Sequence, residues 1–195
     1  MRIKIVEFIS LDGVVQAPGG PEEDTDHGFP NGGWSMPFFD DLVGASFDAA
    51  MQGTEAMLCG RRTWEVFVPA WSERSGDPFA DAINAIPKYV VSDTLTDEDM
   101  TWNTSRIAVA DAVARITALR AAAGGDLLVM GSPTLARMLL SEGLVDELRL
   151  NIEPVILGGG KSIFPTDGGL HAFELVETRT SSTGVLITTY RAPRP

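Results

Sequence analysis

Short runs of alternating or continuous apolar residues recur along the chain and predict β-strands. The first run, Arg2 to Ile9, alternates and is rich in isoleucine and valine, and it ends at the turn-forming pair Asp12-Gly13. The same criteria predict seven further strands, at Glu55–Cys59, Lys88–Val91, Arg106–Ala110, Asp126–Met130, Glu147–Ile156, Phe173–Glu177 and Val185–Tyr190. A turn at Ser181–Gly184 lies between the last two, which are therefore expected to form an antiparallel pair.

Helical patterns stand between most of these strands. Ser35 is expected to cap a helix that runs to about Met51, with a proline and two aspartates in its first turn. The segment TWEVFV predicts a second helix that Pro69 stops, and an alanine-rich stretch predicts a third from Asp111 to Ala123. Strand and helix alternate, which is typical of an α/β domain with a largely parallel sheet, here a single domain over residues 1–195.

A final helix is predicted from the turn Gly131-Ser132-Pro133 to Gly143. Ser132 has the character of an N-cap, Pro133 suits the first helical position, and Gly143 suits the C-terminal end. By contrast, Gln16 to Trp34 is rich in glycine and proline and predicts a long loop. Loops of that length within a compact domain are usually functional covers or disordered.

Charge and composition narrow the class of ligand. The chain carries 27 acidic and 15 basic residues and a net charge of −12, without any lysine- or arginine-rich run. This balance does not favour nucleic acid, whose binding requires neutralised phosphates. The sequence has neither a signal-peptide pattern nor an apolar run of about 18 residues that would predict a membrane span, so a cytoplasmic location is expected.

Few residues are suited to metal or nucleophilic chemistry. Zinc deaminases need His-x-Glu with Pro-Cys-x-x-Cys, but the chain has one cysteine and two histidines, and no metal site is expected. Cys59 lies within an apolar strand and is expected to be buried. His27 and His171 lie in separate glycine- and proline-rich segments and are expected to be solvated. The Gly-x-Ser-x-Gly motif of serine hydrolases is also missing.

The stretch VILGGGKSIFP raises the alternative of a nucleotide hydrolase or kinase, because Gly160-Lys161-Ser162 resembles the end of a Walker A loop. The motif requires a glycine five positions before Gly160, where the chain has Val155. A helix should also begin at the lysine, whereas Pro165 and two glycines follow it. The sequence therefore does not favour a P-loop, and the three glycines are expected to allow a close backbone approach instead.

Two segments, AMLCGRRTW and LLVMGSPT, place a glycine between a buried strand and the start of a helix. Ligands of α/β sheets bind beyond the carboxyl ends of the strands, and free amides at a helix N-terminus attract phosphate. Arg61 and Arg62 add positive charge to the first turn. Two such turns suit a dinucleotide, although each glycine could also serve only to pack a helix against a strand.

The order of motifs resembles the dihydrofolate reductase-like fold over nearly the whole chain. The matching segments are SLDG, GGW, MLCGRRTWE, YVVS, VMGSPTL and VDELRLNIEPVILGGGKSIFP. Within that fold the chain resembles the reductase domain of riboflavin biosynthesis and its stand-alone bacterial relatives most closely. The resemblance implies a three-layer fold, with a mostly parallel central sheet, helices on both faces and a C-terminal antiparallel hairpin.

This resemblance also implies NADPH as a cofactor and assigns roles to matching positions. Gly60, Arg61, Arg62 and Thr63 would meet the pyrophosphate and the 2′-phosphate, and Ser92 would lie near the adenosine. Gly131, Ser132, Pro133 and Thr134 would form a second turn facing the phosphates. Ser132 departs from the paired glycines that are usual at this turn.

At the substrate end, Asp40 and Asp41 lie close to the position of the acid that handles the proton in dihydrofolate reductase. Each could equally be a helix-terminus charge. Asn151 is a third catalytic candidate, and Trp34 and Asp12 are candidates for substrate contact. Closure of the loop from Gln16 to Trp34 is expected to exclude water.

The prediction is an NADPH-dependent reductase that transfers a hydride to a small heterocyclic or ribosylaminopyrimidine-type substrate. The alternative is a non-catalytic NADPH-binding module with the same fold. The family resemblance also favours a homodimer.

Overall fold

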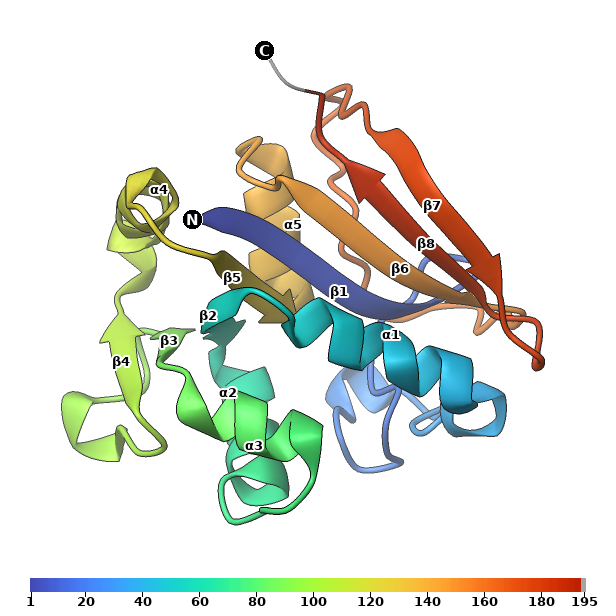
Figure 1. The fold of residues 1–195 in the computed structure, drawn as a ribbon, viewed down its shortest axis with the longest axis horizontal. Coiled ribbons are helices and arrows are strands. Elements are labelled where there is room, and N and C mark those ends of the chain that lie inside the picture. Colours follow the sequence, from blue (N-terminus) through green and yellow to red (C-terminus); the bar gives the residue numbers. More distant parts are fainter. Residues whose placement is uncertain (194–195) are drawn as a thin grey trace.

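The computed structural model describes residues 1–193, which form one eight-stranded sheet with the strand order β4-β3-β2-β5-β1-β6-β8-β7 (Figure 1). The first six strands in this order, β4, β3, β2, β5, β1 and β6, are parallel to one another. Strand β8 runs antiparallel to β6, and β7 runs antiparallel to β8. The bounds are β1 Arg2–Ser10, β2 Thr54–Gly60, β3 Lys88–Val91, β4 Thr104–Ile107, β5 Asp126–Met130, β6 Glu147–Glu153, β7 Glu174–Thr180 and β8 Leu186–Arg191. This architecture confirms the expected mostly parallel sheet with a C-terminal antiparallel hairpin.

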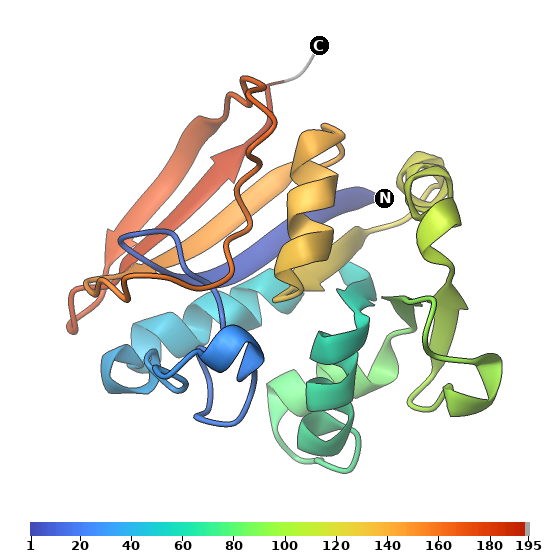
Figure 2. The same cartoon turned by 180° about the vertical axis from the view of Figure 1, so that it is seen from behind.

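Helices cover both faces of the sheet, as Figures 1 and 2 show from opposite sides. Their bounds are α1 Asp41–Met51, α2 Arg61–Trp71, α3 Pro78–Ala85, α4 Ala112–Ala121 and α5 Pro133–Ser141. Buried side chains of α1, α2 and α3 share one apolar cluster, and those of α4 and α5 share the other. No helix within residues 1–193 combines the length and apolar character needed to cross a membrane.

Strand β1 lies near the middle of the sheet and supplies both clusters. Ile5 and Ile9 belong to the cluster of α4 and α5, whereas Val6 and Phe8 pack with the cluster of α1, α2 and α3. This alternation follows from the two-residue period of a strand. It also places Glu7, which lies between Val6 and Phe8, on the same side as Ile5 and Ile9.

Helix α1 starts later than the sequence predicts. Asp40 is the N-cap, and its carboxylate accepts a hydrogen bond from the Val43 amide at 3.0 Å. The chain first makes a short 3-10 turn at Met36–Phe38 and then becomes extended at Phe39, which separates Ser35 from the helix. The Ser35 hydroxyl instead donates to Oε1 of Glu153 at 2.6 Å.

Helix α2 passes through Pro69 and ends at Trp71, so the prediction that Pro69 stops it is wrong. Pro69 is exposed and lies two residues before the end of α2, so the helix has to accommodate the proline only in its last turn. The sequence analysis also missed α3. Local signals for it exist, because Asp77 caps the amide of Ala80 at 3.0 Å and Pro78 occupies the first helical position.

Candidate functional site

A cleft of about 890 Å³ opens beyond the carboxyl ends of β1 and β5. The ends of these strands form its floor, the first turns of α2 and α5 contribute to it, and the loop after β1 covers part of it. Parallel α/β sheets generally bind ligands at this edge. The structure brings five of the predicted cofactor residues to the cleft, namely Arg62, Thr63, Gly131, Ser132 and Pro133.

The two glycine turns are hydrogen-bonded to each other. The amide of Gly60 donates to the Ser132 hydroxyl at 2.9 Å, and the amide of Ser132 donates to the Thr63 hydroxyl at 3.0 Å. Gly131 has a φ of 60°, and a Cβ there would lie 3.3 Å from the Thr63 hydroxyl oxygen, so the close contact favours glycine. Ser132 occupies the N-cap position of α5, as predicted, but its side chain links the two turns and makes no cap hydrogen bond to the helix.

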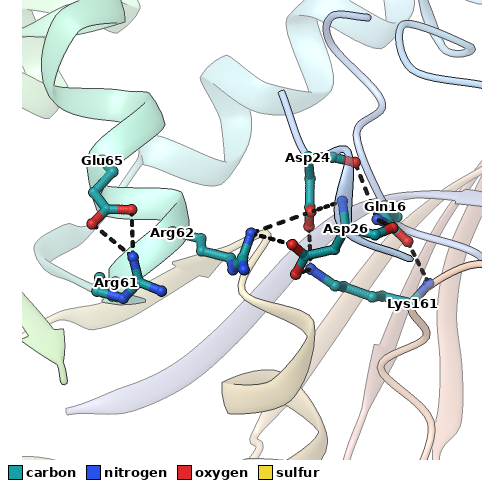
Figure 3. A network of polar contacts seen from close by, with 7 residues as sticks. All are labelled: Gln16, Asp24, Asp26, Arg61, Arg62, Glu65 and Lys161. Atoms are coloured by element: carbon teal, nitrogen blue, oxygen red, sulfur yellow. Dashed lines mark hydrogen bonds and ion pairs between the residues drawn. The ribbon is translucent and has the colours of Figure 1, made fainter. Parts of the chain in front are cut away.

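The two arginines after Gly60 have different surroundings (Figure 3). Arg61 points away from the loop and pairs with Glu65, one turn further along α2, at 2.8 Å. Arg62 pairs with Asp26 at 2.7 Å and lies 3.7 Å from Asp24. Only Arg62 lines the cleft, so the structure separates two residues that the sequence analysis treated together.

Asp24 and Asp26 form an acidic pair that also binds Lys161. The Lys161 ammonium lies 2.8 Å from Asp26 and contacts Asp24 as well (Figure 3). The Lys161 hydrogen bond, together with Arg62, lowers the pKa of Asp26 below its usual value. Arg62, which the sequence analysis expects to meet a phosphate, is thus already paired with carboxylates of the protein's own loop.

The segment from Gln16 to Trp34 is folded against the cleft by several hydrogen bonds. The Gln16 side-chain amide donates to the carbonyls of Asp24 and Asp26 and accepts from the Lys161 amide at 3.1 Å. The Trp34 indole donates to the Gln16 carbonyl at 2.7 Å and is buried at the base of the loop. Trp34 therefore closes the loop onto itself and lies outside the cleft lining.

Glu7 is a buried acid on the floor of the cleft. Its residue is 3% exposed, and its Oε1 has no hydrogen-bond partner within residues 1–193. Burial raises the pKa of Glu7 well above its usual value, and the backbone amide of Gly131 opposes this only in part. Burial favours the protonated form of the carboxyl group, which can donate as well as accept a hydrogen bond.

Aromatic side chains line the other part of the cleft. Phe8, Phe39 and Phe47 gather between β1 and α1, with the Phe8 and Phe47 rings 4.6 Å apart. Trp71 and Phe79, from α2 and α3, face the cleft with ring centroids 5.0 Å apart. This part of the cleft can hold a flat apolar ligand.

The three predicted catalytic residues lie outside the cleft lining. Asp40 caps α1 and accepts two hydrogen bonds from Ser182, and these contacts lower its pKa. Asp41 is an exposed residue of the first turn of α1. Asn151 is buried behind α1, where its Oδ1 accepts from the Ser46 hydroxyl at 3.1 Å, and it borders a separate small hollow. A different acid, Asp48, lies on the cleft side of α1.

Three other predicted residues make structural contacts elsewhere. Asp12 accepts hydrogen bonds from Ser10 and from the amides of Leu157 and Gly158, which lower its pKa to about 2. The buried Ser92 hydroxyl accepts from the two amides of the turn that follows β3. Thr134 is exposed on α5.

The glycine-rich stretch after β6 packs against the segment that follows β1. The Val15 amide donates to the Lys161 carbonyl at 2.9 Å. A Cβ at Gly160 would lie 2.5 Å from Val14, so the backbone approach needs glycine there. Because Lys161 pairs with the loop acids and its amide donates to Gln16, the stretch serves as a packing and loop-holding segment.

Comparison with known proteins identifies the family. The model of the RibD C-terminal domain matches residues 2–187. The chain belongs to this family. It is 26% identical to the uncharacterised protein YyaP of Bacillus subtilis, and the match covers 97% of this chain and 94% of YyaP.

Solved structures with the same fold include members of the reductase families. A putative riboflavin biosynthesis protein from Shewanella sp. PV-4 has a TM-score of 0.70 at 21% identity, with full coverage of both chains. A pyrimidine reductase-like protein from Corynebacterium diphtheriae has a TM-score of 0.64 at 15% identity, covering 100% of this chain and 92% of that one. Dihydrofolate reductase from Enterococcus faecalis, complexed with NADP(H) and RAB-propyl, has a TM-score of 0.60 at 15% identity, covering 99% and 97%. The fold of this chain is therefore dihydrofolate reductase-like.

The sequence analysis missed Glu7, Asp24 and Asp48 as cleft residues, and it missed Asp26 as a partner of Arg62. Glu7 occupies a polar position of an alternating strand, which by itself predicts solvent exposure. Asp48 lies seven residues after Asp41, two helical turns along, and the helical repeat could have placed it. One partner of Asp24 and Asp26, Lys161, is more than a hundred residues away along the chain, and local sequence patterns do not connect it with them.

Proposed function

We propose that the protein is an NADPH-dependent reductase that transfers a hydride to a small heterocyclic or ribosylaminopyrimidine-type substrate. The observation that carries this proposal is the convergence of Arg62 with the two glycine turns on one cleft at the carboxyl edge of the sheet. Membership of the RibD C-terminal domain family supports a reductase. The Enterococcus relative, whose complex contains NADP(H), supports a nicotinamide cofactor.

The residues present fit such a cofactor. Arg62 can pair with a 2′-phosphate, and the amides in the first turn of α2 have no partners within their own helix and can meet a pyrophosphate. Bound NADPH would supply the hydride. The turn at Gly131 lies next to the Glu7 carboxyl group and would hold the remainder of the dinucleotide along the cleft floor.

A proton must accompany the hydride, and Glu7 is the acid that we assign to it. The substrate gains one hydride from NADPH and one proton from the Glu7 carboxyl oxygen, and water then restores the proton. Glu7 is suited to this role because it lines the cleft, has an oxygen without a partner among residues 1–193, and has a pKa that burial raises well above its usual value. Asp40, already held by Ser182 and Val43, is less suited to it.

Arg62→Ala and the matched control Arg61→Ala test the cofactor assignment. We expect Arg62→Ala to weaken NADPH binding by about tenfold or more and to leave NADH binding nearly unchanged, because only NADPH carries the 2′-phosphate. Arg61→Ala should change neither affinity, since Arg61 pairs with Glu65 outside the cleft. Calorimetric titration with both nucleotides measures this. Equal losses for NADPH and NADH, or equal effects of the two variants, would refute the assignment.

A non-catalytic NADPH-binding module is the second candidate function. It is favoured by the placement of Asp40 and Asp41, which lie outside the cleft lining. A screen that follows NADPH absorbance with dihydrofolate and the pyrimidine intermediate of riboflavin biosynthesis separates the two candidates. Turnover above the rate of the Glu7→Gln variant supports the reductase, whereas tight NADPH binding without oxidation supports the module.

We also propose that the protein is a cytoplasmic homodimer. All seven residues of β7, the last strand of the sheet, are exposed, including Leu175 and Val176 at 56% and 50%. An exposed apolar edge strand is a common site of association. Light scattering after size-exclusion chromatography should give twice the chain mass of 20.9 kDa. A monomer at micromolar concentration would contradict the homodimer.

A further inference from the structure

The cleft has an unequal balance of charge. Six acidic residues line it, Glu7, Glu22, Glu23, Asp24, Asp48 and Asp77, and Arg62 is the one lysine, arginine or histidine of the lining among the residues that the structure describes. Arg62 is itself paired with Asp24 and Asp26. If Arg62 pairs with one anionic group, a second anionic group in the cleft would therefore lie among carboxylates and would have no cation of the lining to pair with.

The charges are also divided in space. Arg62 lies at the start of α2, beside the turns assigned to the cofactor phosphates. Asp48 lies on α1 next to Phe47, on the aromatic side of the cleft, and makes no ion pair with any residue of 1–193. The other acid on this side, Asp77, caps α3. Arg74 lies over the Trp71 ring at 4.7 Å and is outside the lining.

The aromatic side has two walls. One is formed by Phe8, Phe39 and Phe47, and the other by Phe67, Trp71 and Phe79. Aromatic side chains favour flat rings through stacking and edge contacts, and they also attract cations. The walls come from elements on the α1 side of the sheet, and Glu7 lies on the floor of the same cleft.

We infer that the substrate of this cleft is a flat aromatic molecule that carries no phosphate and is neutral or positively charged. This inference rests on the proposed reductase function and narrows its substrate. The ribosylaminopyrimidine phosphate of riboflavin biosynthesis does not fit, because its phosphate has no cation once Arg62 holds the cofactor. An unphosphorylated heteroaromatic ring lies between the two walls, with Asp48 beside it.

Three probes of similar shape and different charge test this inference. They are 1-methylnaphthalene, which is neutral, N-methylquinolinium, which is a cation, and 1-naphthyl phosphate. Binding is measured by calorimetry with saturating NADPH, and again without nucleotide in the Arg62→Ala variant, which removes the cleft arginine. We expect the cation to bind at least as tightly as the neutral probe, and the phosphate to bind at least about tenfold more weakly than the neutral probe in both experiments.

Asp48→Asn is the informative variant. It should abolish the preference for N-methylquinolinium over 1-methylnaphthalene and leave the affinity for 1-methylnaphthalene nearly unchanged, whereas Asp41→Asn, at an exposed position of the same helix, should change neither. The inference is overturned if 1-naphthyl phosphate binds as tightly as 1-methylnaphthalene in the Arg62→Ala variant, or if neither uncharged nor cationic probe binds. A failure of NADPH to bind would refute the proposed cofactor, but it would not change the expected order of affinities for the three probes.

Discussion

The two ends of strand β1 differ in whether their buried ionisable side chain is paired within the protein. At the amino end, the Lys4 ammonium is 3.0 Å from Asp126, which also forms two hydrogen bonds with Arg2. At the carboxyl end, Glu7 is buried in the cleft floor and keeps an oxygen without a partner in the part of the chain that the structure describes. At the amino end the protein's own carboxylate pairs with the buried ammonium group. At the carboxyl end a carboxyl oxygen is left to form a hydrogen bond with a ligand.

The difference matters because an unpaired buried polar group is costly and persists at few positions other than functional ones. Desolvation lowers the pKa of Lys4, but its hydrogen bond with Asp126 opposes the shift and favours the charged form. At Glu7, desolvation dominates, raises the pKa and favours the neutral form. Substitutions at the two ends should therefore affect different properties, stability at one and ligand chemistry at the other.

Asp126→Asn tests the amino end and has the largest expected effect on stability. It leaves the buried Lys4 ammonium without its carboxylate, so the free energy of unfolding should fall by about 3 to 5 kcal/mol. The double variant Lys4→Met/Asp126→Leu should recover most of this loss, because no buried charge remains. Urea denaturation measures both. A loss below 1 kcal/mol for Asp126→Asn would show that the pair contributes little.

Glu7→Gln tests the carboxyl end. Burial favours the neutral form of Glu7, and the substitution introduces a neutral amide of similar shape, so the free energy of unfolding near pH 7 should change by no more than about 1 kcal/mol. The rate of NADPH oxidation should fall by about 100-fold, since general acid catalysis contributes about 10² to 10⁴. The native rate should decline as pH rises through the pKa of Glu7, and the variant should lack this limb. A stability loss as large as that of Asp126→Asn would make Glu7 a structural residue.

Glu153, at the end of β6, can be compared with Glu7 because it is a buried acid with one carboxyl oxygen hydrogen-bonded. Its Oε1 accepts from Ser35, and burial raises its pKa to about 7. The folded protein therefore binds more protons than the unfolded chain between pH 4.5 and 7, so this group makes stability fall as pH rises through that window. Glu153→Gln should flatten the decline, whereas Glu98→Gln at an exposed position should not. Thermal denaturation from pH 4.5 to 8 measures the difference, and parallel profiles for wild type and Glu153→Gln would contradict it.

The smallest expected effect concerns the acidic pair of the loop. Asp24→Asn/Asp26→Asn removes the carboxylates that compete with a phosphate for Arg62, so NADPH affinity should increase by a few-fold at low salt. The increase should disappear when Arg62→Ala is added. Calorimetry at 50 and 500 mM salt measures it. Weaker NADPH binding in the double variant would show that the pair orders the loop for the cofactor instead of competing with it.

The parts of the fold that local patterns describe were predictable. The buried strands at Glu55–Cys59 and Asp126–Met130 and the glycine turns after them depend on neighbouring residues, and the structure has them nearly where the sequence places them. The start of α1 was misjudged, because Ser35 and Asp40 are both good caps and only the extended backbone at Phe39 selects between them.

The candidate site was less predictable because its chemistry comes from distant contacts. Pairing of Lys161 with Asp24 and Asp26 spans more than 130 residues, and the raised pKa of Glu7 depends on strands and a loop that meet only in the folded chain. Asp40 and Asp12 carry the residue types expected of a site, but their hydrogen bonds hold turns in place. Residue type and spacing therefore pointed to the edge of the sheet that carries the candidate site, and the contacts point to the acids that we propose within it.

The structure of the complex with NADPH tests the central claim most directly. The account predicts the 2′-phosphate in contact with the Arg62 guanidinium, the pyrophosphate at the first turn of α2, and the nicotinamide end near Gly131 and Glu7. The aromatic side of the cleft should remain free for substrate. A nucleotide bound outside this cleft, or one whose 2′-phosphate is held by Arg61 instead of Arg62, would contradict the account.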